Sequence, residues 1–75
     1  MTKTQIKKVI KEYEYTMINP SLYNAHDGCW LFNAFDTHGQ CYRFWIDEGC
    51  DYATKQVLSD VCILEEQNIS RWFFD

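Results

Sequence analysis

The sequence predicts a single α+β domain, with an N-terminal helix, a central antiparallel β-hairpin, a second helix and a possible third strand at the C-terminus. Three observations predict this order. Residues 1–15 carry apolar side chains at helical spacing, residues 30–47 alternate around a turn, and residues 52–66 carry a second apolar stripe. A chain of 75 residues is long enough for one such domain and too short for two.

The first helix is expected from Thr2 to about Tyr15. Its apolar positions recur every three or four residues and therefore share one side of the helix; they are Ile6, Val9, Ile10, Tyr13 and Met17. Thr2 and Gln5 have the spacing of a capping box, in which a hydroxyl and an amide satisfy backbone N–H groups at the helix start. The period-two alternation of residues 12–17 leaves open a short strand at the end of this helix.

A proline ends the first helix, because the residue before a proline avoids the α region. This pair is Asn19-Pro20. Residues 21–28 are rich in turn-compatible side chains and are expected to form a loop.

The strongest local signal is a β-hairpin formed by residues 30–36 and 40–47. Asp36 suits the first position of a type I turn, and Gly39 suits the left-handed position that follows. This turn aligns the strands so that one face is wholly apolar, with Trp30, Phe32, Ala34, Tyr42, Phe44 and Ile46. The opposite face is mixed, with Leu31, Asn33, Phe35, Cys41, Arg43, Trp45 and Asp47. A two-residue turn at His38-Gly39 would shift the register by one and mix the two faces, so the longer turn is preferred.

A second helix is expected from about Tyr52 to Glu66, with Asp51 as its N-cap. Its stripe consists of Ala53, Val57, Leu58, Val61, Cys62 and Leu64. The β-branched content of residues 61–64 keeps a strand possible there. Residues 69–74 are aromatic and could add a third strand to the hairpin edge, since two strands alone are marginal in water.

The composition is typical of a folded, soluble chain. Hydrophobic residues make up 47% of the chain and aromatic residues 17%, which excludes a disordered segment. No apolar run approaches the roughly 18 residues of a membrane helix, and the N-terminus has no apolar core of the signal-peptide type. We therefore expect a cytoplasmic protein that does not contact the membrane.

Charge is distributed unevenly along the sequence. Residues 1–15 hold four lysines and two glutamates, whereas the remainder is acidic and brings the net charge to −4. A net-acidic chain lacks the broad positive surface that nucleic acid requires, so no direct nucleic-acid binding is expected. The lysines are interpreted as a solvated helix face, with nucleic-acid binding through that one face as the alternative.

Two His-x-x-Cys segments raise the possibility of a zinc site. They are His26 to Cys29 and His38 to Cys41. The predicted hairpin places Cys29 and His38 at opposite ends, about eight residues apart at ~3.3 Å each, which no metal ion spans. We therefore expect neither a metal nor a cofactor.

The four cysteines are expected to be free thiols, because the sequence carries no secretory signal. Cys62 lies on the apolar stripe and is assigned to the core. A disulfide between Cys29 and Cys50, near the base of the hairpin, is the alternative. His26 beside Cys29 lacks the orienting group and pocket that nucleophilic catalysis needs, so no catalytic residue is assigned and the protein is not expected to be an enzyme.

The chain has thirteen aromatic residues, more than so small a core can hide. Trp45 lies between Arg43 and Asp47 on the mixed hairpin face, and aromatic residues with arginine are enriched at interface hot spots. A helix or the C-terminal strand covers this second face, or else a partner protein or a second copy of the chain does.

In size, acidity and aromatic content the chain resembles small phage-encoded inhibitors of host defence, the anti-CRISPR and anti-restriction group. The resemblance implies a protein-binding module that masks a surface of a larger host-defence or nucleic-acid-processing complex in the host cytoplasm. Acidic side chains would complement a positively charged nucleic-acid channel, and the candidates are Asp47, Glu48, Asp51, Asp60, Glu65 and Glu66. The other expected contact residues are Phe35, Arg43, Trp45 and Trp72. The alternatives are a self-associating regulatory homodimer and a small zinc or thiol protein.

Overall fold

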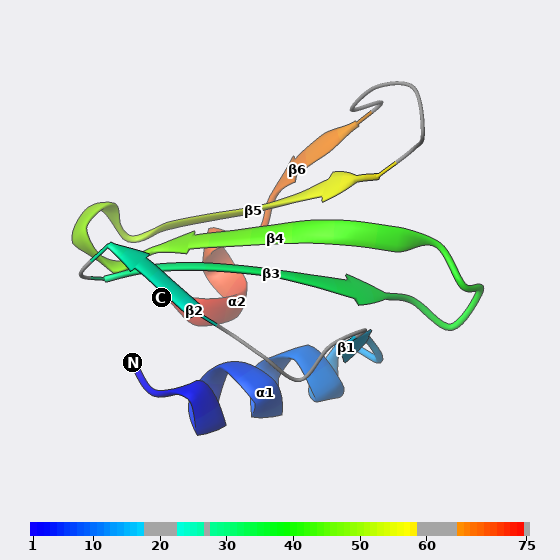
Figure 1. The fold of residues 1–75 in the computed structure, drawn as a ribbon, viewed down its shortest axis with the longest axis horizontal. Coiled ribbons are helices and arrows are strands. Elements are labelled where there is room, and N and C mark those ends of the chain that lie inside the picture. The colour runs from blue at the N-terminus through cyan, green and yellow to red at the C-terminus, as the bar shows by residue number, and fades with distance from the viewer. Residues whose placement is uncertain (18–22, 27, 59–64, 75) are drawn as a thin grey trace.

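The computed structural model of the protein describes residues 1–17, 23–26, 28–58 and 65–74. Within these residues the chain forms a mixed α+β fold that is mostly sheet, with a six-stranded antiparallel sheet and two α-helices (Figure 1). In chain order the elements are α1 (Lys3–Glu12), β1 (Thr16–Met17), β2 (Tyr23–His26), β3 (Cys29–Phe35), β4 (Cys41–Asp47), the 3-10 helix η1 (Glu48–Cys50), β5 (Tyr52–Val57), β6 (Glu66–Asn68) and α2 (Ser70–Phe73).

The sheet follows the order β1-β3-β4-β5-β6, and β2 also pairs with β3. β1 and β2 therefore share one edge of β3. β1 pairs at the C-terminal end of β3, where Thr16 lies opposite Phe35, and β2 pairs at its N-terminal end, where Asn24 lies opposite Trp30. Residues 23–26 were expected to belong to a loop, and that expectation is wrong, because pairing with the free edge of β3 extends the backbone there.

The predicted register of the central hairpin is confirmed. β3 and β4 pair Phe32 with Phe44 and Trp30 with Ile46, as the five-residue turn requires. The turn closes through the Asp36 N–H, which donates to the Gln40 carbonyl at 3.0 Å. The hairpin is the centre of a larger sheet, because β4 also pairs with β5 along its other edge.

The Asp36 carboxylate organises this turn. The backbone N–H groups of His38 and Gln40 each donate to its Oδ1 atom at 2.9 Å, and the Tyr42 hydroxyl donates to Oδ2 at 3.2 Å. Desolvation alone would raise the pKa of Asp36, but these three hydrogen bonds bring it below its ordinary value. Gly39 completes the turn at a φ of 83°, in the left-handed region that favours glycine.

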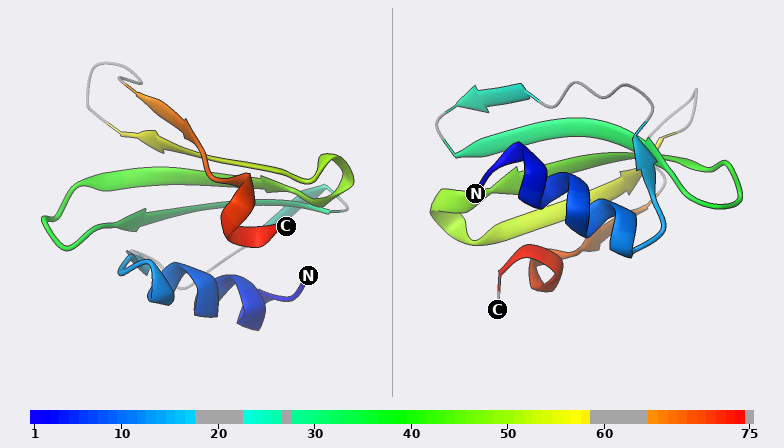
Figure 2. Two further views of the ribbon diagram at one scale, coloured as in Figure 1. Left: turned by 180° about the vertical axis from the view of Figure 1, so that it is seen from behind. Right: turned by 90° about the horizontal axis from the view of Figure 1, so that it is seen from below.

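Both helices lie over the same face of the sheet, and the core lies between them and the strands (Figure 2). The apolar hairpin face predicted from the sequence points into this core. Phe44, on β4, is fully buried, and its ring stacks on Phe32 with centroids 5.1 Å apart. The buried apolar side chains are Ile6, Ile10, Trp30, Phe32, Ala34, Phe44, Ile46, Ala53 and Ile69.

The first helix starts as predicted and ends earlier. The Gln5 N–H donates to Thr2 Oγ1 at 3.2 Å and the Thr2 N–H donates to Gln5 Oε1 at 2.8 Å, which completes the capping box. α1 ends at Glu12 rather than near Tyr15, because Glu14 adopts a left-handed φ of 66° and the chain turns into β1. The short strand that the alternating pattern left open is therefore present. In the described part of the chain, neither helix is long and apolar enough to cross a membrane.

The expected second helix over residues 52–66 is wrong. β5 and β6 occupy the two described ends of this segment, and residues 59–64, with Asp60 and Cys62, lie outside the described residues. β5 pairs along its whole length with β4, from Tyr52 opposite Asp47 to Val57 opposite Tyr42. The backbone hydrogen bonds offered by the open edge of β4 therefore override the helical spacing of the apolar residues.

Two further expectations about the C-terminal half are wrong. Asp51 is not a helix N-cap, because it ends η1 in a left-handed conformation with a φ of 47° and leads directly into β5. Residues 69–74 do not form a strand. Ile69 is buried against the core, its N–H donates to the Ala53 carbonyl at 2.8 Å, and the chain then turns into α2.

We predict that Phe44→Ala lowers the free energy of unfolding by about 3–5 kcal/mol, because it removes the buried ring at the centre of the core. Arg43→Ala is the matched control. Arg43 is the preceding residue and faces solvent, so its loss should change that free energy by less than about 0.5 kcal/mol. Urea denaturation followed by circular dichroism measures both variants. Equal losses would contradict the assignment of the two faces.

Candidate functional site

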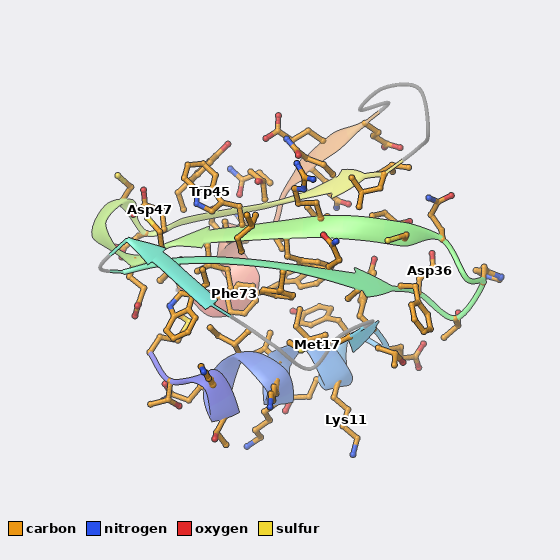
Figure 3. All side chains as sticks on the ribbon, viewed as in Figure 1. Lys11, Met17, Asp36, Trp45, Asp47 and Phe73 are labelled. Atoms are coloured by element: carbon orange, nitrogen blue, oxygen red, sulfur yellow. The ribbon has the colours of Figure 1, made fainter. Side chains whose placement is uncertain are left out.

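The face of the sheet that points away from α1 and α2 is the candidate site. No described helix or strand lies over it, and Figure 3 shows Trp45 on the side of the sheet opposite α1. Because side chains alternate along a strand, the register defines which residues share this face. We call it the open face; it consists of Cys29, Leu31, Asn33, Phe35, Cys41, Arg43, Trp45, Asp47, Tyr52, Thr54, Gln56, Glu66 and Asn68.

Trp45 lies near the centre of the open face, opposite Leu31 on one side and Thr54 on the other. Its side chain is 40% exposed, and Tyr52, which is 37% exposed, meets it edge to face with centroids 6.2 Å apart. Thr54 is only 2% exposed beside these rings. Two large aromatic side chains thus stand on two paired strands, β4 and β5, with much of their surface in contact with water.

Two opposite charges flank Trp45 on the same strand. Arg43 lies two residues before it and is exposed; within the described parts of the chain no ion pair joins its guanidinium to a carboxylate. Asp47 lies two residues after Trp45 and is half-buried. Its Oδ1 atom accepts a hydrogen bond from the Gly49 N–H at 3.0 Å and so caps η1. The open face therefore carries a positive charge toward one end of β4 and a negative charge toward the other.

The structure brings five of the sequence-predicted contact residues onto the open face. They are Phe35, Arg43, Trp45, Asp47 and Glu66. Asp51 is exposed just before β5, and Asp60 lies outside the described residues. Glu65 is exposed but lies toward the core side of the sheet, where it lines a small cavity with Tyr42 and Lys55. Tyr52 was missed, because residues 52–66 were assigned to a helix; the alternation of Tyr52, Thr54 and Gln56 was the signal that could have found it.

Trp72 and Glu48 were also expected to contact a partner, but the structure places both on the helix side. The Trp72 ring stacks on Tyr13 with centroids 3.9 Å apart. The Glu48 carboxylate pairs with the Met1 amino group at 2.6 Å and accepts a hydrogen bond from Trp30 Nε1 at 3.1 Å. These internal partners explain why neither residue reaches the open face. The hydrogen bond from the amino group, followed by that from Trp30, lowers the pKa of Glu48.

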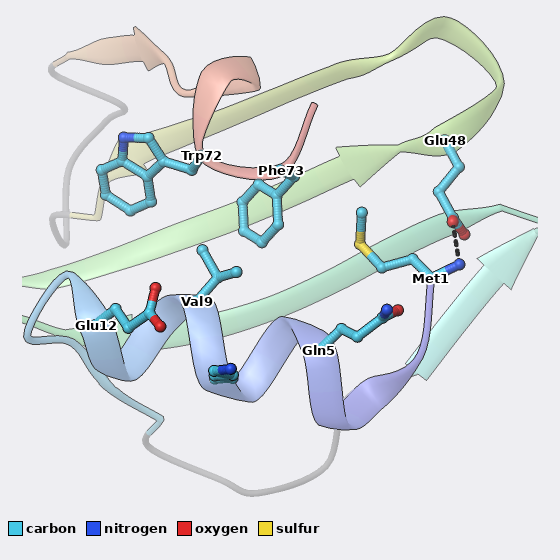
Figure 4. A pocket seen from close by; sticks show the side chains of 8 residues that line it. Met1, Gln5, Val9, Glu12, Glu48, Trp72 and Phe73 are labelled. Carbon is cyan, nitrogen blue, oxygen red and sulfur yellow. Dashed lines mark ion pairs between the residues drawn. The ribbon is translucent and has the colours of Figure 1, made fainter. Parts of the chain in front are cut away.

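A groove runs between the two helices beside these residues (Figure 4). It has a volume of about 510 Å³. Val9, Trp72 and Phe73 give it apolar walls, and the lining is completed by Met1, Gln5, Lys8, Glu12 and Glu48. Of its polar groups, the Met1 amino group and the Glu48 carboxylate are joined in the ion pair described above.

The four residues of the hypothetical zinc site are not gathered at one place. His38 lies in the turn that follows β3, whereas Cys29 is the first residue of that seven-residue strand. The described residues contain no group of three or more possible metal ligands. Cys50 is exposed, and the negative charge of Asp47 raises the pKa of its thiol. A thiol that stays protonated at neutral pH is a poor nucleophile.

An internal cation accounts for part of the aromatic surplus. Lys55 is on the core side of β5, and its Nζ atom lies 4.9, 4.8 and 5.4 Å from the ring centroids of Tyr15, Tyr42 and Trp72. The Lys55 ammonium also donates a hydrogen bond to the Tyr15 hydroxyl. Tyr15, Tyr42 and Trp72 thus form an aromatic cage around Lys55. This cage joins the segment before β1 to β4, β5 and α2. These rings are therefore committed to the fold, whereas Trp45 and Tyr52 remain exposed.

Comparison of the chain with protein-family models, with curated proteins and with solved structures gave no significant match.

We predict that Lys55→Met lowers the free energy of unfolding by about 1–2 kcal/mol, because it keeps the apolar stem but removes the cation from its three rings. Lys7→Met, at an exposed position of α1, is the matched control and should have little effect. Thermal and urea unfolding measure the difference. An unchanged stability in K55M would show that the aromatic cage contributes nothing.

We also predict that Glu48→Gln flattens the dependence of stability on pH. The pKa of Glu48 lies below its ordinary value of 4.5, so the ionised carboxylate contributes stability that is complete above that value and lost as pH falls through the folded-state pKa. Free energies of unfolding at a series of pH values between about 3 and 6 test this, since the unfolded-state pKa of a glutamate falls within that range. Identical pH profiles for the two proteins would contradict it.

Proposed function

We propose that the protein is a binding module that masks a surface of a larger protein or nucleoprotein complex, and that its open face makes the contact. The observation that carries the proposal is the exposed pair of Trp45 and Tyr52 beside the exposed charge of Arg43. Tryptophan, tyrosine and arginine are the residues most enriched at interface hot spots. Because the pair is held on the paired strands β4 and β5, little conformational entropy is lost when a partner covers it.

The distribution of charge favours a basic target. The open face carries the acidic side chains Asp47 and Glu66, with Asp51 exposed just before β5, against the single positive charge of Arg43. The lysines of α1 belong to the helix on the other side of the sheet (Figure 3). A molecule with this polarity is steered so that its acidic side meets a positive surface. A positive surface is what a nucleic-acid-binding complex presents, and this supports the inhibitor reading that the resemblance to phage-encoded proteins suggests.

The proposal is tested by capturing partners from a bacterial lysate with tagged wild-type protein and with the W45A and Y52A variants. We expect a stoichiometric partner that both variants retain at least about tenfold less well, as for loss of a hot spot. Lys7→Ala on α1 is the control and should retain the partner.

A partner held equally well by the wild-type protein, W45A and Y52A, or lost only in K7A, would contradict the proposal. Repeating the capture at two salt concentrations separates the two modes of masking. Release by salt favours electrostatic complementarity, and retention favours steric masking by the aromatic rings.

A further inference from the structure

We infer that the open face is complementary to itself and that a second copy of the chain covers it in the free protein, with the two sheets packed face to face. The inference takes from the proposed function only the open face as the contact surface. It adds that a second copy occupies this surface when no target is present, and that a two-fold axis relates the two copies.

Three residues on β4 give the open face a regular spacing of charge. Arg43, Trp45 and Asp47 occupy alternate positions and point to the same side of the sheet. At a rise of about 3.4 Å per residue, the two charged residues lie roughly 7 Å before and after Trp45 along the strand. The face thus has an aromatic centre with opposite charges at equal distances from it.

Only one orientation of a two-fold axis brings the opposite charges of two copies together. Two copies of one face pack about an axis that lies between the sheets, so that residue i meets j and j meets i. An axis that crosses the strands over Trp45 brings Trp45 onto Trp45 and places each Arg43 opposite Asp47 of the second copy. An axis along the strands would instead bring Arg43 onto Arg43, which like charges disfavour. The charges therefore select the crossing axis.

The neighbouring rows are compatible with the same axis. Leu31 is a direct cross-strand neighbour of Trp45 and meets its own copy, which extends the weakly polar centre. Thr54, the neighbour on the other side, is only 2% exposed and contributes little to the contact. Tyr52 and Gln56 exchange places across the axis, so neither meets a charge. Glu66 lies on β6 at the edge of the sheet, in the same cross-strand row as Gln56 and Arg43. Aligned sheets cross at an angle of about 30°, so residues far from the axis are displaced from their partners in the second copy more than residues close to it.

The size of the face predicts a weak dimer. Because the molecule measures 30 × 22 × 21 Å, one side of the sheet offers roughly 600 Å², somewhat less than the ~800 Å² per partner of a standard stable interface. We therefore expect association in the micromolar range or weaker. Such a dimer would shield Trp45 and Tyr52 from water and still release them to a target that binds more tightly.

Charge reversal tests this symmetry directly by sedimentation equilibrium. The wild-type protein should dimerise with rising concentration. R43D places two negative charges at each contact and D47R two positive charges, so each variant alone should show a dissociation constant at least about tenfold higher. An equal mixture of the two should recover the wild-type association, because both contacts of the mixed dimer then join an aspartate to an arginine.

A wild-type protein that stays monomeric at millimolar concentration, or a mixture no better associated than its components, would overturn the inference. Asp47 also caps η1, so D47R must first match the circular dichroism of the wild-type protein. If it does not, W45A gives the second test, because it leaves the cap intact and must raise the dissociation constant by at least tenfold. K7D, on α1, should dimerise normally.

The two proposals fail separately. Loss of self-association with retained capture of a target through Trp45 would remove the second copy and leave the proposed function. A protein that forms the dimer with the predicted charge pattern but captures no target would keep the second copy and remove the proposed function. The R43D and D47R mixture helps here as well, since it restores both aspartate–arginine contacts of the dimer but not the wild-type charge order that a target would recognise.

Discussion

The antiparallel pairing of β3 with β4 is the interaction on which the rest of the structure depends. The turn held by the Asp36 carboxylate and Gly39 sets the register of this pair. That register sends Phe44 into the core and leaves the next residue, Trp45, on the open face. A slip of one residue would exchange the two sets of side chains, so the core and the open face are fixed by the same few hydrogen bonds.

The aromatic residues divide into two groups with different roles. Tyr15, Tyr42 and Trp72 surround the Lys55 ammonium on the core side of the sheet, and they hold elements together that are distant in sequence. Trp45 and Tyr52 contact each other on the opposite side and remain exposed. A small domain that keeps two large rings in water loses hydrophobic stabilisation, and a partner or second copy that covers them restores it.

Local rules were sufficient to predict the capping box of Thr2 and Gln5, the hairpin turn and the composition of both hairpin faces. They failed at β5 because of Lys55. Ala53 and Val57 lie four residues apart, which suits a helix, and the charged residue midway between them hides the alternation of a strand that faces the core. Only the folded structure shows that three rings surround this lysine. The same error concealed Tyr52, so half of the exposed aromatic pair was missed although the alternation of Tyr52, Thr54 and Gln56 was present in the sequence.

The indole N–H signals of Trp30, Trp45 and Trp72 in an NMR spectrum test most directly whether the open face is the contact surface. Their positions are recorded while the protein is diluted from millimolar concentration, and again while a captured target is added. The account predicts that the Trp45 signal moves in both series and that the signals of Trp30, bonded to Glu48, and Trp72, stacked on Tyr13, stay nearly fixed. Movement of the Trp72 signal with a stationary Trp45 signal would contradict it and would place the contact on the helix side.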